Sequence, residues 1–169
     1  MDRSDEAIRT GRPAARFIFQ GGPAARDAAS RGFGVALPTV ACRAEMAGER
    51  AALWLGPDEW LLLASPGEVD TVFAEIENAL AGNPHSLVDV THRQVGLSVS
   101  GPDARELLAS GCPLDLAPES YPVGMCTRTL LAKAEVVLWR RSAEEYHLET
   151  GRSFSGYVLG WLREAQRGG

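Results

Sequence analysis

Residues 97–111, Leu-Ser-Val-Ser-Gly-Pro-Asp-Ala-Arg-Glu-Leu-Leu-Ala-Ser-Gly, carry the clearest signal of a strand followed by a helix. The alternating apolar residues indicate a strand, and Pro102 then opens a helix at a first-turn position, where its missing N–H is not needed. Residues 17–32 show the same order: Phe-Ile-Phe-Gln-Gly-Gly-Pro-Ala-Ala-Arg-Asp-Ala-Ala-Ser-Arg-Gly. Pro23 falls on Pro102 and Gly32 on Gly111, each 79 residues later (102 minus 23). A strand and helix repeated in this way predict an internal duplication.

The match continues beyond these two helices. At a spacing of 85 (128 minus 43), Arg43 falls on Arg128 and Leu53-Trp54 on Leu138-Trp139, and Trp60 then falls on Tyr146. Each half therefore has the order β-α-β-β-β-α. Because a half of roughly 70 residues would bury little core alone, we expect two lobes packed into one compact unit.

The predicted fold class is α+β, with antiparallel sheets covered on one face by helices. We expect a flexible N-terminal tail over 1–14, a first lobe over 15–84 and a second lobe over 85–169. In the first lobe the expected strands are 16–20, 39–46, 51–55 and 59–64, with helices over 24–31 and 69–80. In the second they are 86–90, 95–99, 126–131, 135–140 and 146–150, with helices over 103–109 and 153–165. The last helix places five apolar residues on one face: Phe154, Tyr157, Val158, Trp161 and Leu162.

Composition excludes several classes of protein. The 169 residues are 45% hydrophobic and 23% charged, as in ordinary globular domains. A net charge of −5 argues against nucleic-acid binding, which needs a clustered basic face. No apolar run approaches the roughly 20 residues that span a bilayer, and the N-terminus lacks the apolar segment of a signal peptide. Three cysteines form neither a Cys-x-x-Cys pair nor an even set, so we expect reduced thiols in a cytoplasmic protein.

A His-Arg pair follows the strand expected at 86–90. Asp89 lies three residues before His92, and a carboxylate beside an imidazole suits acid–base catalysis. Residues at this spacing across a strand end need not face each other. The competing interpretation, which we favour, is an ion pair between Asp89 and Arg93 at a lobe junction, with His92 packed or in an interface.

Two cysteines lie in the same region. Cys112 and Cys126, with His92, offer ligand atoms for zinc, but the spacing matches no zinc ribbon or finger. Buried thiols explain both cysteines equally simply, and a reactive-cysteine enzyme is a further alternative. The sequence contains no Ser-His-Asp arrangement, nucleotide-binding glycine motif or Walker loop, so we assign no catalytic, cofactor-binding or metal-binding residue. The candidate interface or lobe-junction residues are Asp89, His92, Arg93, Cys112, Asp115, Cys126 and Arg128.

Four segments carry a family resemblance: Asp89-Val-Thr-His-Arg93, Ser100-Gly-Pro-Asp-Ala104, Gly111-Cys-Pro-Leu-Asp-Leu116 and Gly124-Met-Cys-Thr-Arg-Thr129. With Leu55-Gly-Pro-Asp-Glu-Trp-Leu-Leu62, they resemble the gamma subunit of heterotetrameric sarcosine oxidase over about residues 50–166. The Ser-Gly-Pro-Asp-Ala segment is shared with a wider superfamily, the folate-binding fold of the glycine-cleavage aminomethyltransferase, which is known for duplicated α+β lobes. The chain lacks that enzyme's folate-anchoring carboxylate motif.

The resemblance implies a complex of alpha, beta, gamma and delta subunits. Such a complex oxidatively demethylates sarcosine to glycine and yields hydrogen peroxide and, with tetrahydrofolate, methylene-tetrahydrofolate. The resemblance places FAD, FMN, NAD, tetrahydrofolate and zinc in the other subunits and no catalytic group in gamma. We therefore expect a non-catalytic subunit of an oxidoreductase that acts on the CH–NH group of its donor. The alternative is a stand-alone folate-binding or one-carbon-transfer protein.

Overall fold

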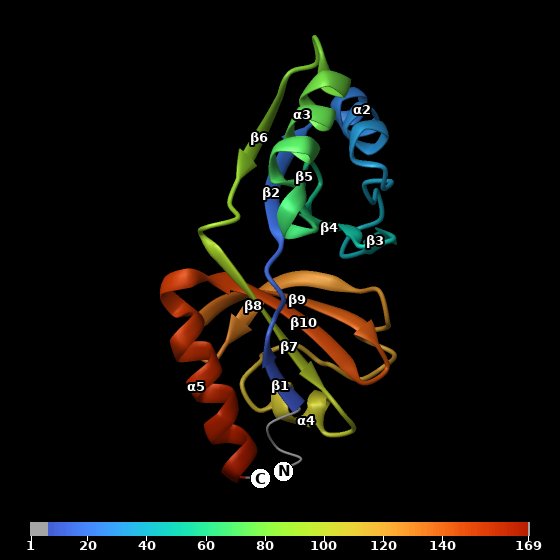
Figure 1. Ribbon diagram of the computed structural model, residues 1–169. Helices are drawn as coiled ribbons and strands as arrows, with labels where there is room; N and C mark the ends of the chain where they lie inside the picture. Colours follow the sequence, from blue (N-terminus) through green and yellow to red (C-terminus); the bar gives the residue numbers. More distant parts are fainter. Residues whose placement is uncertain (1–6, 169) are drawn as a thin grey trace. The chain divides into compact units, whose positions relative to one another are not determined.

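The chain forms two compact units (Figure 1). The computed structural model describes residues 7–168. The first unit is Pro13–His92, and the second unit combines Arg93–Gly169 with the N-terminal segment up to Arg12. In the described part of the chain, no helix is both long and apolar enough to cross a membrane.

The first unit is a five-stranded antiparallel sheet with two helices. The sheet order is β3-β4-β5-β2-β6. The strands are β2 (Ala15–Gly21), β3 (Ala44–Ala47), β4 (Arg50–Gly56), β5 (Glu59–Ala64) and β6 (His85–Asp89). Helix α2 (Pro23–Phe33) begins at a proline and ends before Gly34, whose φ of 77° forms a left-handed cap. Helix α3 (Val69–Leu80) follows a 3-10 turn (Pro66–Glu68) that begins with a capping box between Ser65 and Glu68.

The second unit has the same plan. Its sheet order is β1-β7-β10-β9-β8, again antiparallel throughout. The elements are β1 (Ile8–Thr10), β7 (Gln94–Ser100), α4 (Ala104–Ala109), β8 (Cys126–Leu131), β9 (Ala134–Ser142), β10 (Glu145–Gly151) and α5 (Arg152–Gly168). The predicted α+β class and the repeated β-α-β-β-β-α order are both confirmed.

Each sheet buries one face beneath its helices. In the first unit this core contains Phe17, Phe19, Trp60 and Leu62 from the sheet and Ala25, Ala29, Phe33, Val72, Ile76 and Leu80 from the helices. In the second it contains Leu97, Val99, Leu138, Tyr146, Leu148, Leu108, Val158 and Leu162. On α5, Val158 and Leu162 are buried, whereas Phe154 and Tyr157 are exposed, so only part of the predicted apolar face enters the core.

The two glycines matched in the sequence serve the same purpose. A Cβ on Gly32 would lie 2.7 Å from the Glu75 carbonyl oxygen of α3, and a Cβ on Gly111 would overlap the Trp161 indole of α5. In both units the residue near the end of the first helix must lack a side chain because the second helix packs against it.

The edge strands are exchanged between the two repeats. β1 precedes the first repeat in the chain, yet it pairs with β7 of the second unit. β6 precedes the second repeat, yet it pairs with β2 of the first unit. The predicted boundaries at 14 and 84 therefore need correction, because residues 8–10 form a strand and residues 85–92 belong to the first unit. Backbone pairing with a distant strand overrides order in the sequence, and three-residue β1 is too short to show periodicity.

The repeat also has a different register from the one predicted. Trp60 pairs with Trp54, and Tyr146 pairs with Arg140, so Trp54 corresponds to Arg140 and Leu53 to Trp139, one residue away from the sequence match. Arg43 precedes β3, whereas Arg128 lies inside β8, so this predicted match is also wrong. A slip of one residue moves a side chain to the opposite face of the sheet, which similarity between two short apolar runs does not reveal.

Candidate functional site

The last residue of β6 and the segment that leads from it to β7 contain three of the seven candidate residues: Asp89, His92 and Arg93. The Asp89 carboxylate accepts a hydrogen bond from the Thr91 backbone N–H at 2.9 Å, and the Thr91 hydroxyl oxygen accepts one from the Arg16 N–H at 3.0 Å. Hydrogen bonding from Thr91, followed by the charge of nearby His92, lowers the pKa of Asp89. Asp89 therefore stays ionised at neutral pH and organises a turn at the strand end.

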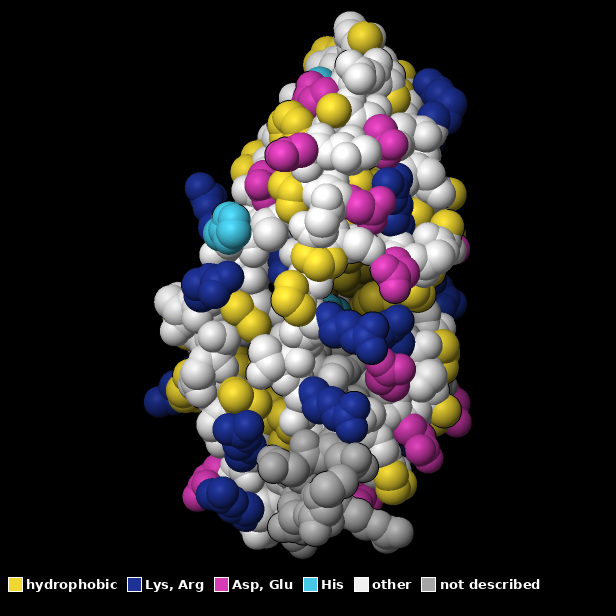
Figure 2. Space-filling view, viewed as in Figure 1, with side chains coloured by type: hydrophobic (Ala, Val, Ile, Leu, Met, Phe, Trp, Pro, Cys, Tyr) yellow, Lys and Arg dark blue, Asp and Glu magenta, His cyan; other side chains and the backbone are white. Residues whose placement is uncertain are grey.

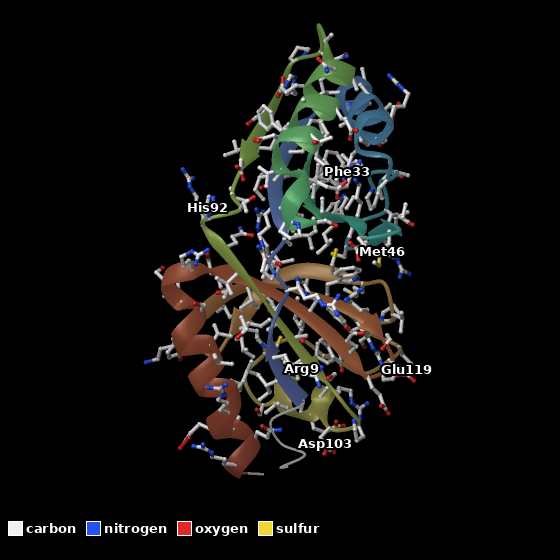
Figure 3. The ribbon with its side chains drawn as sticks, viewed as in Figure 1. Arg9, Phe33, Met46, His92, Asp103 and Glu119 are labelled. Carbon is white, nitrogen blue, oxygen red and sulfur yellow. The ribbon has the colours of Figure 1, made fainter. Side chains whose placement is uncertain are left out.

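His92 and Arg93 are exposed on this segment, and Figure 3 marks His92 at the bend between β6 and β7. The Arg93 carbonyl oxygen accepts a hydrogen bond from the Arg152 N–H at 2.8 Å, at the first residue of α5. Backbone hydrogen bonds thus hold the segment at both ends, from the Val90 N–H to the Arg16 carbonyl oxygen in the first unit and from the Arg152 N–H to the Arg93 carbonyl oxygen in the second. The predicted role of its side chains in an interface stays a prediction.

Asp115 and Arg128 lie in the second unit. Asp115 accepts hydrogen bonds from the Ser120 hydroxyl at 2.7 Å and from the Ala117 N–H at 2.9 Å, and these bonds, chiefly the one from Ser120, lower the pKa of the carboxyl group. It therefore closes a turn in the irregular connection between α4 and β8. Arg128 is exposed on β8, one of the two outer strands of the sheet.

The two candidate thiols lie on opposite faces of the second sheet. Cys112 is 8% exposed in the helix-side core, with its sulfur 3.7 Å from the Thr129 hydroxyl oxygen. Cys126 is fully buried, three residues before Thr129 on the same strand, so its side chain points to the other face. Among residues 7–168, no three His, Cys, Asp or Glu residues group as metal ligands would.

A His-Glu pair on β10, with a buried Glu149 and a half-buried His147, is not among the site residues predicted from the sequence. The His147 Nε2 lies 2.7 Å from the Glu149 carboxylate on β10, and Glu149 is only 2% exposed. The Trp139 ring meets the His147 ring edge-on at 6.0 Å between centroids. The spacing of two within a strand puts both side chains on one face, which is the only signal the sequence offers. The His147 imidazole gives the buried Glu149 carboxylate a hydrogen-bond partner, which reduces the cost of burying the carboxylate.

Arg140 is likewise not among the residues predicted from the sequence. It is 5% exposed, and its guanidinium donates hydrogen bonds to the carbonyl oxygens of Tyr121 at 2.8 Å, Ala143 at 2.9 Å and Ser142 at 3.3 Å. It also stacks over the Tyr146 ring. A buried arginine bound to backbone carbonyls ties the α4–β8 connection to the β9–β10 turn, which is a structural task.

The geometry thus assigns local structural contacts to most candidate residues, and comparison with known proteins shows the family. The sequence pattern of the sarcosine oxidase, gamma subunit family matches residues 20–167. The chain belongs to this family. The sarcosine oxidase subunit gamma of Corynebacterium sp. (strain P-1) is 36% identical over 115 residues, which cover 68% of this chain. The chain spans 56% of the length of that relative.

Solved structures agree with the family. A chain in heterotetrameric sarcosine oxidase from Corynebacterium sp. U-96 matches with a TM-score of 0.89 and 27% identity, over 95% of this chain and 83% of that chain. The glycine-cleavage aminomethyltransferase T of Bartonella henselae matches with a TM-score of 0.70 and 14% identity, over 92% of this chain and 44% of that one. The second likeness concerns the fold alone, and it confirms the predicted aminomethyltransferase-like architecture for this member of the gamma subunit family.

Proposed function

We propose that this chain is the non-catalytic gamma subunit of a heterotetrameric sarcosine oxidase. On this proposal the complex oxidatively demethylates sarcosine to glycine, with formation of hydrogen peroxide and methylene-tetrahydrofolate. The observation that carries the proposal is the family match over residues 20–167, together with the structural match over 95% of the chain to a protein of that complex. The chain contributes to the oxidase through assembly and stability of the complex.

The local geometry supports a structural role. Asp89 and Asp115 are engaged in turns, Cys112 and Cys126 lie on opposite faces of a sheet, and Glu149 is buried with His147. We infer that the partners are the alpha, beta and delta subunits, that FAD, FMN, NAD, tetrahydrofolate and zinc are bound by those subunits, and that the complex is cytoplasmic. The seven candidate residues would then serve an interface or the junction between lobes.

Co-expression of the four subunits tests the proposal. With this chain present, we expect a complex of four subunits on size-exclusion chromatography and sarcosine-dependent production of hydrogen peroxide. Without it, we expect less assembled complex and a loss of turnover in proportion. Unchanged assembly and unchanged turnover without the chain would contradict the proposal. Tetrahydrofolate titration of the purified chain, followed by Trp fluorescence, separates the folate-binding alternative, for which saturable quenching is expected.

A further inference from the structure

The face of the first sheet that points away from its helices carries a continuous apolar row. The strand register places Ala44, Leu53, Leu61, Ile18 and Val88 side by side across all five strands. Leu53 and Leu61 are fully buried, Ile18 is half-buried and Val88, on the outer strand β6, is 40% exposed. The row therefore runs from a buried centre to an exposed apolar end at the edge of the sheet.

The edge at β6 lacks the usual protection of an outer strand. Each of the other three outer strands presents an exposed charged side chain within it: Arg9 on β1, Glu45 on β3 and Arg128 on β8. Such charges discourage a foreign strand from pairing with an open edge. β6 has no exposed charge before its last residue, Asp89, and its register with β2 is regular.

The second unit supplies a matched comparison. There, the corresponding row is Cys126, Trp139, His147, Ser98 and Arg9, so Arg9 occupies the place of Val88. β1 is also shorter, with three residues against five in β6. One repeat thus has a short edge strand with a charge at this position, and the other has a longer strand with an exposed valine.

The backbone of β6 offers hydrogen-bonding groups to a further strand. The Val90 N–H donates to the Arg16 carbonyl oxygen at 2.8 Å, which makes this a hydrogen-bonded pair of the antiparallel ladder. Because such pairs alternate, Val88 also bonds toward β2, and the N–H and C=O groups of Leu87 and Asp89 point to the open side.

Resting on the proposed function, we propose that β6 is a docking edge for an extended segment of another subunit of the oxidase. The segment adds alongside β6 through main-chain hydrogen bonds, places an apolar side chain on Ile18 and Val88, and brings a basic side chain to Asp89. This is recognition by strand addition, in which the backbone provides affinity and alternate side chains provide specificity.

Charge favours a basic partner over a second copy of this chain. Between Pro13 and His92 the sequence has ten acidic and five basic residues, whereas the rest of the chain has twelve of each. Figure 2 shows more acidic than basic side chains on the visible face of the first unit. Two copies meeting at β6 would juxtapose like charges, while a basic segment is attracted. Residues 1–6, Met-Asp-Arg-Ser-Asp-Glu, lack the alternating apolar side chains that an internal occupant needs.

The test is Val88→Arg in the co-expressed four-subunit complex. This change installs the residue type that the other repeat carries at the same position, so the fold is expected to tolerate it. The matched control is Val40→Arg, at an exposed valine (64% exposed) in the α2–β3 connection of the same unit. We expect at least a tenfold weaker association of Val88→Arg with the other subunits and wild-type association of Val40→Arg. Thermal melts of the purified chains check that both variants fold.

A measurement on the wild-type chain tests the proposal without any substitution. In hydrogen exchange, we expect the amides of Leu87 and Asp89 to exchange at least tenfold more slowly in the complex than in the free chain. Unchanged exchange there, or wild-type association of Val88→Arg, overturns the docking edge. A dimer of the isolated chain that Val88→Arg abolishes would assign the edge to a second copy and also overturn it. If the wild-type chain itself does not join the other subunits, the proposed function fails instead.

Discussion

The two units share one topology but differ in the side chains on the sheet face that points away from the helices. At corresponding positions the first unit has Leu53, Leu61, Ile18 and Val88, and the second has Trp139, His147, Ser98 and Arg9. The helix-side cores remain apolar in both units. The helix-side face thus keeps the same apolar character in both repeats, while the other face has an apolar edge in one repeat and a His-Glu pair in the other.

The largest expected loss of stability follows from a change at Arg140, which occupies the position that Trp54 has in the first unit. Arg140→Met is expected to destabilise the chain by about 3 kcal/mol, because three carbonyl groups lose a charged donor inside the protein. Arg141→Met is the neighbouring control. Arg141 is exposed, with its guanidinium over the Trp139 ring, and bonds to Glu145 at 3.2 Å, so a loss of less than about 1 kcal/mol is expected. Urea unfolding measures both variants, and equal losses would refute the structural role of Arg140.

Exchange of the edge strands predicts an effect at the far N-terminus. Ile8 pairs with Val99 and is buried in the second core, so Ile8→Ala should cost about 2 kcal/mol of unfolding free energy. Leu87 holds the corresponding position on β6 but is half-buried, and Leu87→Ala should cost about 1 kcal/mol. Chemical denaturation compares the two. A negligible loss for Ile8→Ala would show that β1 is not an integral part of the second unit.

At two left-handed backbone positions, one repeat has glycine and the other has a residue with a side chain. Cys42 has a φ of 58° where the second unit has Gly124, and Ala132 has a φ of 51° where the first has Gly48. Cys42→Gly and Ala132→Gly should each stabilise the chain by about 1 kcal/mol, since glycine accepts positive φ without strain. Gly48→Ala and Gly124→Ala should each destabilise the chain by a similar amount. Thermal melts measure all four, and destabilisation by both glycine substitutions would contradict the equivalence.

The smallest expected effect depends on pH and belongs to the first unit. His85 bonds to the Asn83 carbonyl oxygen at 2.7 Å and to Glu77 at 3.0 Å, and these contacts, the carbonyl first, raise the pKa of His85. A raised pKa in the folded state means that the stabilisation is full below the ordinary histidine pKa of about 6.5. It is then lost as the pH rises through the folded-state pKa.

Stability against urea, measured at several pH values, checks this expectation. His85→Gln should remove the loss of stability above the ordinary histidine pKa. An unchanged pH profile in His85→Gln would exclude the histidine as its source.

Much of the fold could be predicted because local signals agree with the final structure. The proline that opens α2, the glycine turns and the periodicity of α3 all give correct elements, and the matched glycines at 32 and 111 mark a real packing need. The start of β3 could not be predicted, because Thr39-Val-Ala-Cys42 is as compatible with a strand as the residues that follow, yet the ladder with β4 begins only at Ala44. Of the candidate site, the local roles of Asp89 and Asp115 follow from hydrogen bonds that no spacing encodes.

The class of fold, the duplication and the family could all be inferred from the chain alone, because they depend on periodicity, turn residues and motifs that are local in it. The folded chain was needed to show which repeat each outer strand joins, which residues correspond between repeats and which side chains are buried. These properties depend on pairing between distant strands, and in a sheet a shift of one residue reverses the face of every side chain. Thus the chemistry of Val88 and Arg9, or of Leu61 and His147, becomes comparable only once the register is known.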